Sequence, residues 1–564
     1  MPRGWMVRLA VMGWVGLSGV GLTACVGNPG VSTIGTGGSG AVGTGSGGTG
    51  APGSGGASSG GATGFTLECP KANLGSPLER LLTRTELEAT LVDIFPEVKG
   101  QWSGSLPASN LSAYGFDNDG SAEVGKQLAG ALVDTALSVA TALTGTPLAT
   151  ILPCSTSAAD RACADTFLTK YGKRLFRRPV TQAERDRYLT FFDATKTKSD
   201  FKTALKYMIA GVIQSPNTLY RSEVGAVQGD GTRQLTPHEV ATALAYTYSG
   251  TAPSEALLAK ADAGDLGDVL ATAKTMMASE PGKQMMQRFF EGYLAYTSVS
   301  AIARPNVPNF SNVGGHMAQE TRAFIDDVVL KKGGGIKELL TASTTNPSAA
   351  LATFYAFPAP GGDYAPVTRP ASRGIGVLSQ GSFLTTHASA TGSSPTKRGL
   401  FVYERLLCEP RLSVPDNVPT ISDPMPGQKT TRQRYEELHA KPGTGCAGCH
   451  VRFDPIGFGF EHFDEGGRYR ESESGLAINS TGSASKAGTP LFMFNGQEEL
   501  ARGLAEQPVV AQCVAAHMAT FAYGSNEACT GASQVAALQA GTIGLAEAYA
   551  RLATEPHFTK RNAQ

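Results

Sequence analysis

Two cysteines and a histidine stand together in the stretch Cys446-Ala-Gly-Cys449-His450. At this C-x-x-C-H spacing two thiols, one helical turn apart, reach the two vinyl groups of a porphyrin, and the adjacent imidazole binds its iron. A chain of 564 residues with nine Cys and eight His would contain the pattern by chance in about one in five hundred sequences of this composition. The motif therefore predicts a covalent haem c, with His450 as the proximal ligand.

Three other interpretations of the motif stay open. The thiols can form a disulfide, as in thiol oxidoreductases, although no βαβ pattern surrounds them. They can belong to a structural zinc site, although the sequence offers no second Cys/His pair at the usual spacing. The motif can also be a relic in a domain that no longer binds haem.

The second axial position of the iron needs a ligand of its own, unless the iron is five-coordinate. Met493, forty-three residues past His450, lies at a distance that suits a distal methionine. Core packing is the alternative role of a methionine at such a position. The competing candidates are His439, His462, His517 and Met518.

Three carboxylates follow the motif: Asp454, Glu461 and Asp464. Together they could bind a cation, or one could act as an acid or base near the haem. The favoured interpretation is structural. Asp454-Pro455 then starts a turn, and the carboxylates satisfy loop N–H groups or pair with Arg468 and Arg470.

Helices must position these residues, because strand-like alternation is scarce. Three helix starts carry a Thr-x-x-Glu capping box, in which each side chain bonds the other's free backbone N–H. Apolar residues at helical spacing support helices after the first and third boxes. The boxes are Thr83/Glu86, Thr181/Glu184 and Thr236/Glu239.

Further helices are expected along the whole body, and the segment TTRQRYEELHA is expected to lead into the motif, as in cytochromes c. Ser394-Pro395 opens another helix. We therefore predict a mainly α, multi-domain helical body with a cytochrome c-like CxxCH segment. The other expected helices are 126–143, 158–175, 283–295, 314–331, 497–505, 509–522 and 533–552, with long loops around 297–313, 341–372 and 409–430.

The N-terminus predicts export. Arg3 and Arg8 precede a short apolar stretch that ends in Leu22-Thr23-Ala24-Cys25, a sequence that resembles a bacterial lipobox. An ordinary secretory peptide is the alternative. A lipid on Cys25 would anchor the chain to a membrane without a spanning helix. The Gly- and Ser-rich residues after it cannot form a core and are expected to be a disordered tether.

Val26, after that cysteine, favours the outer membrane of a Gram-negative cell, by analogy with lipoprotein sorting in enteric bacteria. The chain is then expected in the cell envelope, facing the periplasm or the cell surface. Its 48 basic and 48 acidic residues balance, so nothing in the charge suggests a nucleic-acid partner.

Six cysteines remain after Cys25, Cys446 and Cys449 are set aside. An even number of cysteines in an exported protein indicates disulfides. Free buried thiols are the alternative. Cys154 and Cys163 are close enough to close a small loop. The other two expected pairs are Cys513–Cys529, after a helix, and Cys69–Cys408, by elimination.

Several long phrases resemble a family of exported multi-domain proteins of planctomycetes and myxobacteria, made of consecutive domains of unknown function and sometimes called PSD domains. The resemblance covers nearly the whole body. Its phrases include RLLTRTELEATLVDIF, YGKRLFRRPVTQAERDRYLTFF, QLTPHEVATALAYTYSGTAPSEALL, RGIGVLSQGSFLTTHASATGSSPTKRGLFVYERLLC and FNGQEELARGLAEQPVVAQCVAAHMATFAYG.

With this resemblance the chain divides into seven segments. The expected segments are a lipoprotein signal peptide (1–24), a lipid-anchored linker (25–64), N-terminal (65–153), second (154–228) and central (229–365) helical domains, the CxxCH domain (366–485) and a C-terminal helical domain (486–564).

Two classes of function follow. The first is a membrane-anchored c-type haem lipoprotein that passes electrons to a redox protein partner. The second is a helical lipoprotein that binds or scaffolds a surface polymer or a protein, with CxxCH as a disulfide or a relic. The resemblance brings no settled activity, and no hydrolase motif such as G-x-S-x-G or H-E-x-x-H occurs in the body.

Overall fold

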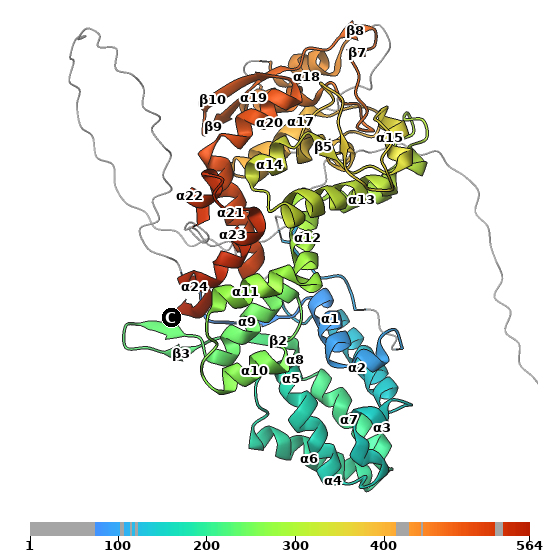
Figure 1. Ribbon diagram of the computed structural model, residues 1–564, viewed down its shortest axis with the longest axis vertical. Helices are drawn as coiled ribbons and strands as arrows, with labels where there is room; N and C mark the ends of the chain where they lie inside the picture. Colours follow the sequence, from blue (N-terminus) through green and yellow to red (C-terminus); the bar gives the residue numbers. More distant parts are fainter. Residues whose placement is uncertain are drawn as a thin grey trace, which may run out of the picture. The chain divides into compact units, whose positions relative to one another are not determined.

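The structure, a computed structural model, describes residues 74–101, 106–112, 115–118, 122–412, 428–441, 444–524 and 534–563. Within these ranges the chain is mainly helical and has only small sheets, as the sequence predicted (Figure 1). No helix in the described ranges has the length and hydropathy needed to cross a bilayer. The predicted signal peptide, Cys25, the Gly/Ser linker, Cys69 and Cys529 lie outside them.

The first described part of the chain is a group of helices bounded by a two-stranded antiparallel sheet, in which Arg80 of β1 lies opposite Arg221 of β2. Its elements are β1 (Leu78–Leu81), α1 (Arg84–Ile94), η1 (Pro96–Val98), α2 (Lys126–Leu143), α3 (Leu148–Ile151), η2 (Pro153–Thr156), α4 (Arg161–Phe167), η3 (Leu168–Gly172), α5 (Lys173–Phe176), α6 (Gln182–Lys196), α7 (Phe201–Ile213), α8 (Pro216–Leu219) and β2 (Tyr220–Glu223).

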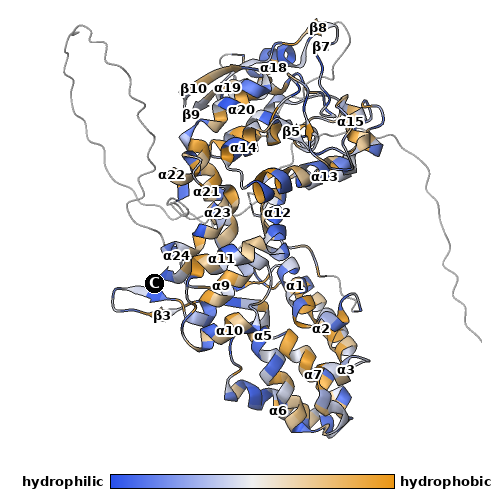
Figure 2. Ribbon diagram, in the orientation of Figure 1, coloured by the Kyte–Doolittle hydropathy of each residue, from blue (hydrophilic) through white to orange (hydrophobic). Residues whose placement is uncertain are grey.

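The helix starts follow from local sequence. Thr83, Thr181 and Thr236 each form the complete capping box predicted for them, at the starts of α1, α6 and α9 (Pro237–Ser249). The helices then bury their apolar faces; α7 is strongly hydrophobic (Figure 2) and contributes Leu205 and Met208, both fully buried, to the core of this group. Capping fixes where these helices begin, and burial of the apolar face stabilises them.

The next part of the chain continues as helices with short strands between them. The loop expected around 341–372 contains a helix and two short strands that periodicity did not reveal. The elements are β3 (Ala226–Val227), β4 (Thr232–Gln234), α9 (Pro237–Ser249), α10 (Glu255–Asp262), α11 (Val269–Ala278), α12 (Glu280–Leu294), η4 (Tyr296–Ala301), η5 (Phe310–Asn312), α13 (Gly314–Ile325), η6 (Asp326–Lys331), α14 (Ile336–Thr341), β5 (Thr344–Thr345), α15 (Ala349–Tyr355) and β6 (Val367–Thr368).

The part that carries the C-x-x-C-H motif ends in a hairpin, β9–β10, that the sequence analysis did not predict. Ala487 and Gly488 at its tip both have positive φ, the conformation of a tight hairpin turn, but Ala-Gly is a weaker signal than Asn-Gly. The elements are η7 (Val377–Ser379), α16 (Gly381–Thr386), α17 (Pro395–Phe401), η8 (Val402–Leu406), α18 (Thr431–His439), α19 (Gly445–Gly457), η9 (Phe458–Phe460), β7 (Ser472–Glu473), β8 (Leu476–Ala477), β9 (Thr481–Lys486) and β10 (Thr489–Asn495).

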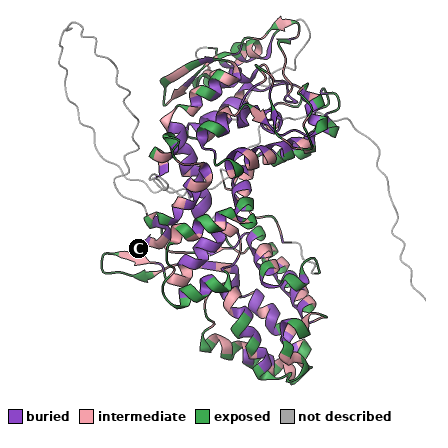
Figure 3. Cartoon of the chain, in the orientation of Figure 1, coloured by how far each residue is buried: buried purple, intermediate pink, exposed green. Residues whose placement is uncertain are grey.

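The closing part centres on α21, which is buried along almost its whole length (Figure 3). The single helix expected over 533–552 is divided in two, because Gly541 turns the chain with a positive φ. The elements are α20 (Gly496–Ala505), α21 (Pro508–Tyr523), α22 (Val535–Gln539), α23 (Leu545–Arg551), η11 (Leu552–Thr554), α24 (Pro556–Thr559) and β11 (Lys560–Asn562), which pairs with β4.

Helices α17 and α19 pack backbone against backbone. A methyl group added to Gly399 would lie 1.9 Å from the carbonyl oxygen of Phe453, and one added to Gly457 would lie 1.9 Å from that of Pro395. Both distances are far below van der Waals contact, and the atoms met are main-chain atoms that cannot rotate away. Only glycine therefore fits at either position.

We predict that Gly457→Ala destabilises the chain by about 2–3 kcal/mol, because the two helix backbones must move apart. Gly448→Ala is the matched control, since it lies in the same helix with no atom within 4 Å of the added methyl group. Denaturant unfolding followed by circular dichroism measures both. Equal unfolding midpoints for the two variants would contradict the close crossing.

A buried cluster of charged side chains connects β1 and β2, near the start of the described chain, with β11 at its end. The Glu223 carboxylate on β2 lies 3.2 Å from Arg80 on β1 and also pairs with Arg561 on β11 and, at 3.6 Å, with Arg221. Burial alone would raise the pKa of Glu223, but the three guanidinium groups outweigh it and lower the pKa to about 2.

This lowered pKa predicts a pH-dependent stability. The contribution of Glu223 is complete above its ordinary pKa of 4.5 and is lost as the pH falls toward 2. Glu223→Gln should destabilise the chain by about 3 kcal/mol at pH 7, where it leaves buried guanidinium groups uncompensated. Unfolding at pH 7 and pH 3 should show the difference from wild type shrinking by about half at pH 3; an unchanged difference would refute this account.

Candidate functional site

The C-x-x-C-H motif forms the first turns of α19. Thr444 caps this helix, and its hydroxyl accepts a hydrogen bond from the backbone N–H of Ala447. Cys446 and Cys449 lie one turn apart, are half-buried and are both free thiols. The alternative in which these two residues form a disulfide therefore finds no support in the structure.

Helix α18 lies upstream as predicted, but the motif does not end it. The helix stops at His439, and α19 begins anew after a break. The sequence gives the reason: Pro442 and Gly443 follow, and a proline disfavours helical backbone at the residue before it. A second expectation is also corrected. Asp454-Pro455 does not start a turn, because α19 continues through Pro455 to Gly457.

The imidazole of His450 is held by one nitrogen. Its Nδ1 lies 3.1 Å from Oδ2 of Asp454, one turn further along α19, and 3.3 Å from the hydroxyl of Thr396 on α17. The same hydroxyl donates to Oδ1 of Asp454 at 2.6 Å. Nε2 of His450 makes no hydrogen bond to the described residues, which leaves it available as a ligand atom.

A second imidazole shares the same carboxylate. Nδ1 of His439, the last residue of α18, lies 2.8 Å from Oδ2 of Asp454. The two rings stack with their centroids 3.5 Å apart and a tilt of 33°. Burial would raise the pKa of Asp454, but the hydrogen bonds of His439, His450 and Thr396 outweigh it and lower the pKa.

The other residues considered for the second axial position lie elsewhere. Met493 is on β10 with 85% of its surface exposed, and Met518 is buried in α21. Nε2 of His517 lies 4.0 Å from Sγ of Cys408, and burial with nearby Arg405 lowers the pKa of His517 to about 3. His462 pairs its Nδ1 with the carbonyl of Arg470 at 2.9 Å. Of these candidates, His439 alone contacts His450 among the described residues.

The three carboxylates after the motif do not converge on one site. Asp464 accepts from the backbone N–H of Gly466 and of Arg468, and its other oxygen lies 2.8 Å from the Arg468 guanidinium. This is the loop-stabilising role that the sequence favoured. Asp454 instead faces the two histidines.

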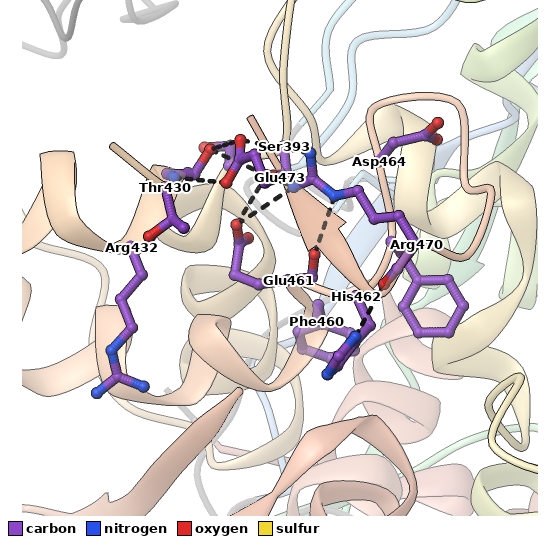
Figure 4. A network of polar contacts seen from close by, with 12 residues as sticks. Ser393, Thr430, Arg432, Phe460, Glu461, His462, Asp464, Arg470 and Glu473 are labelled. Carbon is purple, nitrogen blue, oxygen red and sulfur yellow. Dashed lines mark hydrogen bonds and ion pairs between the residues drawn. The ribbon is translucent and has the colours of Figure 1, made fainter. Parts of the chain in front are cut away.

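Glu461 belongs to a separate buried network with Arg470 and Glu473 (Figure 4). It accepts from Ser393 at 2.9 Å and lies 3.7 Å from Arg470, which also reaches Glu473 at 3.3 Å. Burial dominates over these partners and raises the pKa of Glu461. The network anchors the segment after α19 against Thr431, the first residue of α18.

Arg398 of α17 fixes the same segment from the other side. Its guanidinium is fully buried and donates to the backbone carbonyls of Leu384, Phe460, Phe463 and Asp464. Phe458, Phe460 and Phe463 of this segment are buried. The loop after the motif is therefore a support that holds α19 in place.

The local sequence did contain part of this site. His450 and Asp454 stand four residues apart, which places them on one face of a helix. The partnership with His439 and Thr396 had no local signal, because these residues come from α18 and α17. The approach of Thr396 depends on the crossing of α17 and α19 at Gly399 and Gly457.

The donor set fits a covalent haem. Two half-buried free cysteines lie one helical turn apart, and the following imidazole is oriented by a carboxylate on Nδ1, while its Nε2 makes no hydrogen bond to a described residue. Zinc held through this cysteine pair would still need further Cys or His ligands, and in the described residues no other cysteine or histidine joins the two thiols in a metal-ligating group.

The disulfides confirm one expected pair and replace the other two. Cys154 and Cys163 are bonded, as predicted. Cys408 is bonded to Cys513, which replaces the expected pairs Cys513–Cys529 and Cys69–Cys408. The reason is tertiary: η8 packs against α21, so Cys408 just after η8 meets Cys513 on that helix across 105 residues of sequence.

Four consecutive segments match models of protein families of unknown function. They are PSD3 (DUF1587) at residues 80–145, PSD5 (DUF1595) at 163–223, PSD4 (DUF1592) at 235–357 and PSCyt3 (DUF1588) at 373–473. The chain belongs to this multi-domain family. His439, His450, Asp454 and Thr396 all lie within the PSCyt3 match, and Met493 lies outside it. No curated protein and no solved structure matches the chain.

We predict that non-reducing proteolysis followed by mass spectrometry finds the Cys408 peptide joined to the Cys513 peptide. Loss of this link in Cys513→Ser should make Cys408, which is exposed, reactive toward a maleimide. It should also destabilise the chain by about 4 kcal/mol, because a loop of this length is released. Cys154→Ser is the matched control and should leave Cys408 unlabelled; a Cys408 peptide joined to any other cysteine would show the pairing to be wrong.

Proposed function

We propose that the chain is a membrane-anchored c-type haem protein that acts in electron transfer or redox chemistry at the cell envelope. The observation that carries the proposal is the pair of free thiols, Cys446 and Cys449, beside an imidazole whose Nδ1 is already held by Asp454. The name of the matched PSCyt3 model, which suggests a cytochrome-like domain, agrees with it.

In this proposal Cys446 and Cys449 would hold the porphyrin through thioether bonds, and Nε2 of His450 would bind the iron. The haem would supply a one-electron couple. Asp454 orients the His450 ring and increases the basicity of its free nitrogen, which favours the oxidised iron. Met493 stays the sequence's prediction for the distal ligand, and its exposure means that β10 would have to bring it to the iron.

The location of the protein is part of the proposal. A lipid on Cys25 would hold the chain at the outer membrane of a Gram-negative cell, facing the periplasm or the surface, and the Gly/Ser linker would let the helical body reach its partner. Because Cys446 and Cys449 are half-buried, a haem attached to them would have that edge near the surface, where a redox protein partner could dock for outer-sphere transfer.

A binding role is the second candidate, and a cleft favours it. Residues of β1, α8, β2 and α9, among them Glu79, Tyr220 and His238, line a cavity of about 650 Å³. This volume suits a small molecule or one end of a polymer. The chain would then be a helical scaffold for a surface polymer or a protein.

We predict that the full chain, produced in a host that matures c-type cytochromes, carries haem that survives denaturing electrophoresis and gives a pyridine haemochrome spectrum. Cys446→Ala/Cys449→Ala should abolish the covalent haem, because both thioether bonds are lost. Met493→Ala is the matched control: covalent haem should remain, and only the axial-ligand spectrum should change.

Wild-type chain without covalent haem would refute the redox proposal and favour the binding role. Haem that remains covalent in the double cysteine variant would refute the assigned attachment.

A further inference from the structure

Three metal-binding atoms converge where α18, α17 and α19 meet. Nδ1 of His439 lies 2.8 Å and Nδ1 of His450 lies 3.1 Å from Oδ2 of Asp454. One ligand atom from each of the three residues lies within 4.8 Å of the others. The hydroxyl of Thr396 lies beside these atoms, 2.6 Å from Oδ1 of Asp454.

Asp454 is a buried carboxylate without an arginine or lysine partner in the described part of the chain; its ion-pair partners there are the two imidazoles. Aromatic rings flank the two imidazoles: Tyr435 packs edge-on against His439, and Phe453 packs against His450. A charge buried in such surroundings needs compensation, which a proton on an imidazole or a bound cation can supply.

The separations suit a bound ion. Two ligands that each lie about 2.1 Å from a metal are about 3–3.5 Å apart, close to the separations between Asp454 and the two imidazoles. Two imidazole nitrogens and one carboxylate oxygen form a common ligand set for Zn²⁺ and similar ions, and three protein ligands leave a position open. Both Nδ1 atoms face Oδ2 of Asp454, and the centroids of the two rings lie 3.5 Å apart.

We propose that His439, His450 and Asp454 bind a divalent transition metal, of which Zn²⁺ is the best fit, through Nδ1, Nδ1 and the carboxylate. The site uses the ring nitrogen of His450 that faces Asp454, and neither Cys446 nor Cys449 belongs to it. The proposed metal site therefore does not depend on haem attachment.

The test is a calorimetric titration of the full chain, made without haem maturation, with ZnCl₂, and a parallel titration with Co²⁺ followed by visible absorption. We expect one ion per chain and the ligand-field bands of a low-coordinate Co²⁺ site. His439→Gln and Asp454→Asn should each weaken Zn²⁺ binding at least 100-fold, because one of three protein ligands is lost.

Two controls separate this site from other metal-binding groups. Cys446→Ser/Cys449→Ser should bind Zn²⁺ within about twofold of wild type. His238→Ala removes a histidine that pairs with an exposed aspartate on another part of the chain, and it should also leave the affinity unchanged. Zn²⁺ should raise the melting temperature of wild type but not that of His439→Gln, and this readout also shows that the variant folds.

The proposal is wrong if the chain binds no Zn²⁺, if His439→Gln binds it as wild type does, or if binding is lost with the cysteines. Haem staining of the cysteine variant keeps the two sites distinguishable, because thiol substitution abolishes covalent haem while the three proposed metal ligands stay in place.

Discussion

The backbone contact between α17 and α19 is the constraint on which the candidate site depends. Gly399 and Gly457 allow the two helices to meet with no side chain between them. At this distance Thr396, near the start of α17, reaches both His450 and Asp454 on α19. A larger residue at either glycine would separate the helices and break the contacts of Thr396 with His450 and Asp454.

The surroundings of α19 are built to keep that crossing fixed. Arg398 uses a fully buried guanidinium to hold the backbone of the segment after the motif, and the Glu461–Arg470–Glu473 network ties that segment to α18. Burying these charges is costly unless every one is bonded. In the resulting motif Cys446 and Cys449 are half-buried, while Asp454 and Thr396 hold Nδ1 of His450.

The two ring nitrogens of His450 can serve different purposes. Nδ1 faces Asp454 and His439, and Nε2 is free of hydrogen bonds within the described chain. A haem iron would use the free nitrogen, and a divalent metal would use the nitrogen that faces Asp454. One imidazole thus links the proposed redox function with the proposed metal site, and the carboxylate of Asp454 influences both.

The sequence by itself determined what depends on neighbouring residues: the C-x-x-C-H spacing, the capping boxes at Thr83, Thr181 and Thr236, and the short disulfide between Cys154 and Cys163. Each is a contact across a few positions, so local patterns reveal it. Only the tertiary structure decided that Cys408 meets Cys513 and that His439 joins His450 on Asp454. Those partners come from separate helices, and their meeting depends on packing that no local pattern encodes.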